Sequence, residues 1–185
     1  MAAQLPSHAT KPSEMPDPAQ PEVWLRGPLP DYPDELQPVA HSLLQVREEI
    51  AAVAALAPEH LWARPGGAAP IGFHLRHLAG SLDRLLTYAR GDSLNADQRM
   101  ALSEEGRDGR PQERAETLVR AAHDAIDRAL AHVRTTPLCT LNDVRPVGRA
   151  GLPSTVLGLL FHAAEHAQRH SAQIITTAKI VKGGA

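Results

Sequence analysis

The 185-residue sequence predicts an all-α fold, a four-helix bundle that carries a proline-rich N-terminal arm. Four long stretches place apolar residues at spacings of three and four, which is the periodicity of a helix that buries one face. The links between these stretches are short except for one, and no stretch shows the sustained alternation of a sheet strand. Amphipathic helices without a sheet bury their apolar faces against one another, as a bundle.

Residues 1–32 are expected to form the arm and residues 33–185 the bundle. Prolines exclude helix and central strand from the arm, and they occupy positions 6, 12, 16, 18, 21, 28 and 30. We expect the part before about residue 20 to be a flexible tail. Trp24 and Leu25 are apolar enough to dock the later part onto the bundle, and for Trp24 packing is favoured over a role as a lid.

The four long helices are expected over residues 34–56, 70–90, 111–134 and 153–182. Pro70 suits the first turn of a helix, and Gly91 suits the position just after the last turn. Between the second and third long helices, Asn95 followed three residues later by Gln98 forms the pattern of a capping box. This pattern predicts a short additional helix that ends near residue 105.

The long link, residues 135–151, separates the third helix from the fourth. It has a weak signal for an extended pair, 138–141 with 144–147, and a link of this length is often functional or a crossover. Arg145 and Arg149 could approach an anionic substrate, although solvated roles are favoured. Cys139 is the only cysteine, which excludes an internal disulfide, and no base is evident beside it.

Histidines on the first three helices differ in where the apolar periodicity places them. His41 lies opposite the apolar face of its helix, and His123 and His132 flank theirs, so these three are expected at the surface. His74 lies on one shoulder of the second helix's apolar stripe, and His77 lies further round on a polar flank. Periodicity favours His74 as the more buried ring, but it leaves open which of the two meets the last helix.

The last helix repeats histidine at intervals of four residues. His162, His166 and His170 form one stripe, because a step of four advances a side chain by only about 40°. Gln173 falls near the same line. Apolar residues on this side indicate that the stripe faces the interior; they are Leu159, Ala163, Ile174 and Val181. A buried imidazole needs a partner, and neutral imidazoles one turn apart can share a metal ion. Ordinary hydrogen bonds or a wet helix edge are the alternatives.

Composition excludes several classes of function. A net charge of −2, scattered arginines and an aromatic content of 3% disfavour a nucleic-acid-binding surface. No apolar run reaches the roughly 18 residues of a membrane span. The N-terminus lacks the charged-then-apolar order of a secretory signal. We therefore expect a cytoplasmic protein with neither nucleic-acid nor membrane partners.

Two short motifs give the sequence a family resemblance. The segment Gly72–Ser81, which contains His77-Leu-Ala, together with His166-x3-His170-x2-Gln173, resembles the DinB-like superfamily of metal-binding four-helix bundles. In that family one histidine on the second long helix and two on the last bind a divalent ion. The resemblance thus implies that His77, His166 and His170 are the metal ligands. It favours His77 over His74, against the apolar stripe.

The resemblance covers about residues 33–181, and it departs from the family pattern at Ser171–Ala172, which replace an Arg-Gly pair. It makes His162 a neighbour of the site rather than a ligand. We still expect His74, His162 or His41 to lie near the ion. The metal implied is nickel, zinc or manganese, and the sequence does not rank the three.

The family also implies possible activities. Related proteins are thiol-dependent transferases and isomerases that use low-molecular-weight thiols such as bacillithiol or mycothiol, and others are described as metal-dependent hydrolases. Three imidazoles leave coordination positions open, which is typical of a catalytic metal. We therefore expect a metal-dependent enzyme that activates a thiol or water for attack on a small electrophile. The alternatives are a non-catalytic, metal-stabilised, stress-responsive bundle and a metal-free interaction module. Homodimerisation is expected from related bundles.

Overall fold

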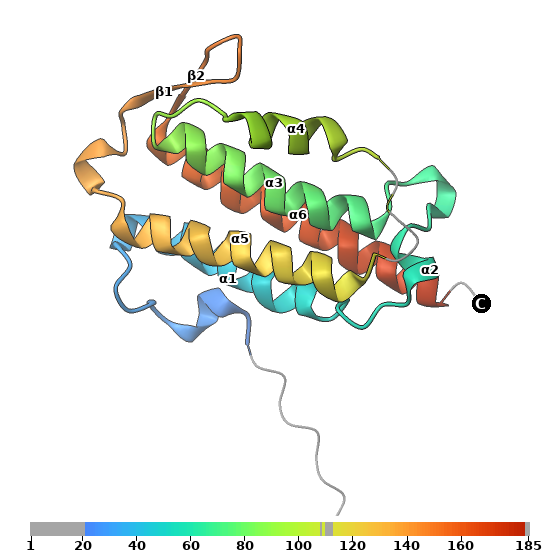
Figure 1. The fold of residues 1–185 in the computed structure, drawn as a ribbon. Helices are drawn as coiled ribbons and strands as arrows, with labels where there is room; N and C mark the ends of the chain where they lie inside the picture. The colour runs from blue at the N-terminus through green and yellow to red at the C-terminus, as the bar shows by residue number, and fades with distance from the viewer. Residues whose placement is uncertain (1–20, 108, 110–112, 184–185) are drawn as a thin grey trace, which may run out of the picture.

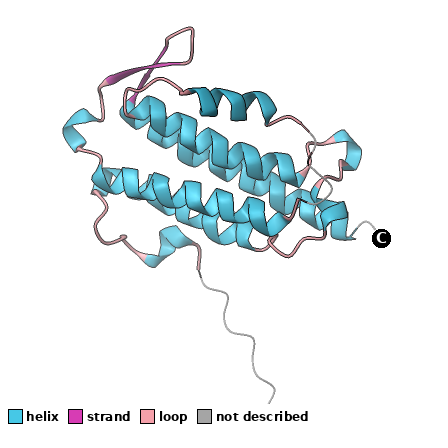
Figure 2. Ribbon diagram, in the orientation of Figure 1, coloured by secondary structure: helices cyan, strands magenta, loops and turns pink. Residues whose placement is uncertain are grey.

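The computed structural model describes residues 21–107, 109 and 113–183, and this part of the chain is mostly helical, with one two-stranded sheet (Figures 1 and 2). The α-helices are α1 Gln37–Ala51, α2 Pro58–Leu61, α3 Ile71–Ala89, α4 Ala96–Glu104, α5 Ala115–Thr135 and α6 Val156–Gly183. The strands are β1 Val144–Val147 and β2 Leu152–Thr155. Short 3-10 helices occur at Val23–Arg26, Asp34–Leu36, Pro65–Gly67 and Leu138–Thr140. None of the described helices is long and apolar enough to cross a membrane. The expected flexible tail lies outside the described residues.

Four long helices, α1, α3, α5 and α6, lie lengthwise side by side (Figure 1). α3 contacts both α5 and α6, and α1 contacts the same two helices. The apolar faces predicted for α1, α3 and α5 form the core, with Leu43, Leu78 and Ile126 at 1%, 0% and 0% exposure. Leu85 is the exception, since it is only partly buried while the neighbouring Leu86 is buried. Helical periodicity therefore located the core correctly to within one position.

Helix boundaries differ from the prediction where tertiary contacts intervene. α1 ends at Ala51 rather than near residue 56, because the chain turns there to reach α2. α5 begins at Ala115 rather than at residue 111, since Glu113 and Arg114 are not helical. α6 begins at Val156 rather than at Pro153, because the preceding four residues form β2.

The long link between α5 and α6 forms a small antiparallel hairpin, where the sequence had only a weak signal for an extended pair (Figure 2). β1 coincides with the extended segment 144–147, but its partner is β2 and not residues 138–141. Residues 138–140 are instead a 3-10 helix. Arg145 of β1 donates from Nε to the Ala89 carbonyl at 3.0 Å, so it caps the C-terminus of α3. This capping contact identifies a structural role for Arg145 in the fold.

α4 lies along the outside of α3 and begins with the capping box that the sequence predicts (Figure 1). The Gln98 N–H donates to Asn95 Oδ1 at 2.8 Å, and the Asn95 N–H donates to Gln98 Oε1 at 2.9 Å. The Gln98 amide also donates to Asp83 of α3 at 2.7 Å. The capping box therefore fixes both the start of α4 and its contact with α3.

Replacing Asn95 with alanine is expected to destabilise the protein by about 1 kcal/mol, the usual cost of losing an N-cap side chain. The Gln98 N–H of the first turn loses its side-chain acceptor, while no core residue changes. Urea unfolding followed by circular dichroism measures the change. Asn95→Asp keeps an acceptor at the same position and should stay within about 0.5 kcal/mol of the wild type; equal losses in both variants would contradict the capping role.

The part of the arm that is described packs on α1 differently from the prediction. Val23 is 2% exposed and docks the arm, whereas Trp24 and Leu25 are 61% and 56% exposed. Arg26 forms a bidentate ion pair with Glu48 of α1 at 2.6 and 2.7 Å. The packing role assigned to Trp24 and Leu25 is therefore wrong; the 3-10 turn rotates Val23 inward in their place.

Candidate metal centre

α3 and α6 pack against each other and bring three histidines together between them. His77 comes from α3, and His166 and His170 come from successive turns of α6. One nitrogen of each ring can be chosen so that these atoms all lie within 4.8 Å of one another. His77 Nε2 and His166 Nε2 are 2.9 Å apart. The three residues that the family resemblance implies as ligands thus converge in the fold.

The second ring nitrogen of His77 contacts a carboxylate from outside these two helices. His77 Nδ1 lies 2.8 Å from Oε2 of Glu105, the residue that follows α4. Glu105 also forms an ion pair with Arg84 of α3, and the two are only 8% and 9% exposed. Burial raises the pKa of Glu105, but hydrogen bonds from His77 and Arg84 outweigh burial and hold the pKa below its usual value. Glu105 is therefore ionised at neutral pH.

A fourth histidine lies beside the three. His74 Nδ1 is 2.9 Å from His170 Nδ1, and His74 also hydrogen-bonds the backbone of Ala69. His74 is 6% exposed, which confirms the prediction that it is more buried than His77. When His170 donates its Nδ1 proton to His74, the Nε2 lone pair of His170 stays available to a metal. His74 therefore lies near the candidate centre, as expected, but outside the group of three.

The two candidate ligands on α6, His166 and His170, are neutral at physiological pH. Burial and the neighbouring His77 lower the pKa of His166 to about 4. Burial and the neighbouring His77 and His166 lower the pKa of His170 to about 3. Neutral imidazole is the form that binds metals, because its unprotonated nitrogen carries the lone pair. Packing the rings together therefore prepares them as ligands rather than as cations.

The residues present fit a divalent transition-metal ion. Three imidazoles are a donor set that suits nickel or zinc, and manganese is the harder alternative. Among the described residues, His166 Nδ1 is a buried nitrogen with no hydrogen-bond partner. Leaving such an atom unsatisfied costs about 1–3 kcal/mol. The cluster thus has unmet bonding capacity at one of its rings, which is consistent with a missing ligand.

The predicted inward stripe of α6 is only half right. His166 and His170 are half-buried, but His162 and Gln173 are exposed. His162 hydrogen-bonds Glu165 at 2.8 Å, and its ring lies 5.2 Å from that of His166. A straight helix in contact with α3 buries little more than two turns of such a stripe, so both ends emerge into solvent. His162 is thus a neighbour of the site, as the family resemblance implies.

The remaining sequence candidates lie on other contacts. His41 Nε2 lies 3.0 Å from the Gly27 carbonyl of the arm. His123 Nε2 lies 2.9 Å from the Arg47 carbonyl, and His123 and His132 are half-buried rather than fully exposed. Cys139 and Arg149 are exposed. The structure therefore brings none of these residues into the group of three histidines.

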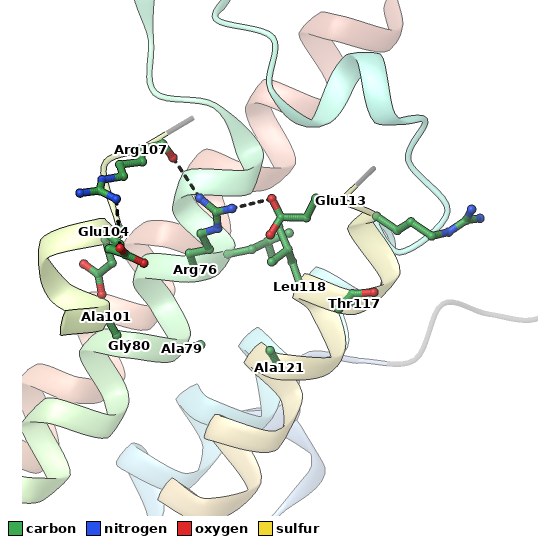
Figure 3. A pocket seen from close by; sticks show the side chains of 13 residues that line it. Arg76, Ala79, Gly80, Ala101, Glu104, Arg107, Glu113, Thr117, Leu118 and Ala121 are labelled. Carbon is green, nitrogen blue, oxygen red and sulfur yellow. Dashed lines mark hydrogen bonds and ion pairs between the residues drawn. The ribbon is translucent and has the colours of Figure 1, made fainter. Parts of the chain in front are cut away.

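Two cavities flank the long helices. One of about 930 Å³ lies among α3, α4 and α5; its charged lining includes Arg76, Glu105, Arg107 and Glu113 (Figure 3). Arg76 and Glu113 both line this cavity, and Arg76 donates to Glu113 at 2.6 Å (Figure 3). The other, about 480 Å³, lies between the arm, α1 and α6. None of the three histidines lines either cavity; Glu105 alone joins the larger one to the candidate centre.

Comparison with known families agrees with this geometry. Residues 42–174 match the family model of the DinB superfamily. The chain belongs to the DinB superfamily. The match includes all three histidines of the candidate centre and confirms the resemblance drawn from the two sequence motifs. No curated protein matches the sequence.

Sequence reasoning missed Glu105 and Arg84 of this DinB-superfamily chain. Arg84 lies seven residues after His77, which places both on the same face of α3. The polar flank of α3 was the available signal for Arg84, because polar side chains on a flank that α4 covers need hydrogen-bonding partners. Glu105 carried no comparable signal, because its role depends on how the chain folds back after α4.

Acidification is expected to destabilise the metal-free protein as the pH falls from about 6.5 towards 4, the range between the usual histidine pKa and that of His166. In this range the unfolded chain binds protons at His166 and His170 while the folded chain does not, so stability is present above the range and is lost on descending through it. Melting temperatures from circular dichroism, recorded in chelator across this range, measure the loss. His166→Leu/His170→Leu should show a flatter profile, and an identical slope would contradict the assignment.

Proposed function

We propose that this protein is a metal-dependent enzyme in which His77, His166 and His170 hold a divalent ion that activates a thiol or water for attack on a small electrophile. The observation that carries the proposal is the approach of one nitrogen from each ring to within 4.8 Å of the others. Membership of a superfamily whose members often bind metals supports it. The ring of contacts among α1, α3, α5 and α6 supports the four-helix bundle as the fold class.

Each ligand has a defined part in this proposal. His77 offers Nε2 while its Nδ1–H donates a hydrogen bond to Glu105. His170 offers a nitrogen while His74 contacts the other. A divalent ion bound to three imidazoles supplies Lewis acidity at its open positions, which lowers the pKa of a coordinated water or thiol. The protein's contribution is to keep the ligands neutral and to fix their directions.

The alternative is a non-catalytic protein in which the ion stabilises the helix pair α3 and α6. The position of His74 beside His170 favours it, because a fourth imidazole could close the coordination sphere. The three histidines line neither of the two cavities described above, which also favours it. An open coordination position is the property that distinguishes the two functions.

Two measurements test the proposal. Elemental analysis of protein purified without added metal is expected to find about one nickel, zinc or manganese ion per chain. A thermal-shift series with small thiols, run on metal-loaded protein and on the same protein in excess chelator, is expected to raise the melting temperature only when metal is present. Absence of metal after reconstitution with all three ions would overturn the metal-dependent function. Bound metal without any thiol shift or hydrolytic turnover would favour the non-catalytic alternative.

The remaining expectations concern partners and location. A low-molecular-weight thiol is the partner that we propose for the thiol-dependent form of this chemistry, and we propose a cytoplasmic homodimer as the working form. Phe161 and Leu157, one turn apart on α6, are 63% and 38% exposed and offer apolar surface for pairing. Sedimentation equilibrium of the wild type and of Phe161→Glu tests the dimer; a monomer in both would contradict it.

A further inference from the structure

The C-terminal end of α4 lies beside the candidate metal centre, although α4 contributes none of the three histidines. Glu105 directly follows the last residue of α4 and is 8% exposed. Its carboxylate oxygens have separate partners. Oε2 lies 2.8 Å from His77 Nδ1 and 3.2 Å from Arg84 Nη2, and Oε1 accepts from Arg84 Nη1. A buried carboxylate is thus held between a histidine and an arginine of α3.

This arrangement fixes which nitrogen of His77 carries the proton. An ionised carboxylate can only accept hydrogen bonds, so Nδ1 must donate to Glu105. With Nδ1 engaged by Glu105, Nε2 is the ring nitrogen that remains for a metal, and it lies 2.9 Å from His166 Nε2. Arg84 keeps Glu105 ionised and in place, because its guanidinium donates to both oxygens.

Gly80 of α3 leaves room for the Glu105 carboxylate beside the helix. Gly80 lies one turn after His77, and a Cβ added there would overlap Glu105 Oε1 and meet Arg84 Nη1 at 2.8 Å. The φ angle of Gly80 is ordinary for a helix, so glycine is not needed for backbone reasons. Glycine inside a helix costs about 1 kcal/mol relative to alanine. Space for the Glu105 carboxylate is the property of Gly80 that offsets this cost.

We propose that Glu105 is a positioning residue that holds His77 in the Nδ1–H tautomer, with Nε2 directed at the ion. The expected effect of Glu105 on metal affinity rests on the proposed metal site. Its effect on the His77 tautomer does not depend on any metal. The residue that follows α4 thereby belongs to the proposed metal centre through its side chain. Carboxylate partners of this kind typically change metal affinity by about 10–100-fold.

Zinc affinity, measured by competition with a chromophoric chelator, tests the first consequence. Glu105→Gln must turn its amide NH₂ towards either Arg84 or His77, both of which donate, so one contact is lost. Gly80→Ala displaces the carboxylate while favouring the helix. Both variants are expected to bind zinc about 10–100-fold more weakly. Glu104→Gln is the matched control, since Glu104 is the preceding residue, is exposed and pairs only with Arg107 among the described residues.

Nitrogen-15 NMR of the metal-free protein tests the second consequence. The wild type and Glu104→Gln are expected to show His77 protonated at Nδ1, and Glu105→Gln and Gly80→Ala are expected to show a mixture of tautomers. Wild-type tautomers and unchanged zinc affinity in both folded variants would overturn the inference. A wild type that binds neither zinc, nickel nor manganese would defeat the proposed function alone, because the tautomer measurement still decides the role of Glu105.

Discussion

His166→Ala is expected to abolish stoichiometric metal binding. This side chain supplies one of three nitrogens that lie within 4.8 Å of one another, and its Nε2 is 2.9 Å from that of His77. Two remaining imidazoles hold a divalent ion poorly, so the affinity should fall by more than the roughly 10–100-fold lost when only a supporting residue is removed. Mass spectrometry of metal content and chelator competition measure the change. Any metal-dependent activity should be lost with it.

His162→Ala is the matched control for this prediction. His162 lies one turn earlier on α6, carries the same side chain and is exposed, and its Nδ1 hydrogen-bonds Glu165. The metal content of the His162→Ala variant should equal that of the wild type. If His166→Ala still binds one ion tightly, the ion is held by other residues and the prediction is wrong. Equal losses in both variants would indicate a less specific effect on α6.

Arg84→Leu is expected to reduce the free energy of unfolding by about 3 kcal/mol, which is typical when one member of a buried ion pair is removed. Glu105 would then be a carboxylate at 8% exposure whose remaining side-chain partner among the described residues is His77. Glu105 would also lose the guanidinium that holds it against His77, so zinc binding should weaken as well. Urea unfolding in chelator measures the stability, and chelator competition measures the affinity.

Two further variants isolate the reason for this loss. Arg84→Leu/Glu105→Leu removes both charges, so most of the stability should return while zinc binding stays weak. Arg120→Leu breaks an exposed pair with Glu116, whose side chains are 66% and 63% exposed, and should cost less than about 1 kcal/mol. A double variant no more stable than Arg84→Leu would contradict the explanation by an unpaired buried charge.

Local sequence signals predicted the helices well because they depend on periodicity and capping, which are local. The apolar faces of α1 and α5, the Asn95 capping box and the greater burial of His74 all follow from spacing along one helix. The choice of His77 as a candidate ligand was different. It required the family resemblance, since the apolar stripe of α3 alone favours His74. His77 meets His166 of α6 from the half-buried flank of α3 and not from the centre of the apolar stripe of α3.

Features that depend on contacts between residues far apart in the sequence could not be predicted from periodicity or capping signals. β2 was assigned to the start of the last helix, because Pro153 suits a first helical turn as well as a strand end. Glu105 lies 28 residues from His77 and meets it only because α4 folds back along α3. Trp24 was expected to pack because it is large and apolar, yet the 3-10 turn buries Val23 instead. Each of these outcomes is determined by contacts between elements, which no single-helix pattern contains.

The β1–β2 hairpin has a consequence for self-association of the protein. A two-stranded sheet has two open edges, and this one also exposes Val144 and Leu152 at 70% and 62%, a combination that invites further strands to add. Pro146 and Pro153 lie directly opposite each other in the register. Because proline has no N–H, this pair cannot be a hydrogen-bonded one, and its nitrogens face outward. Each edge thus lacks one of its outward-facing backbone N–H donors, which protects the hairpin against the addition of further strands.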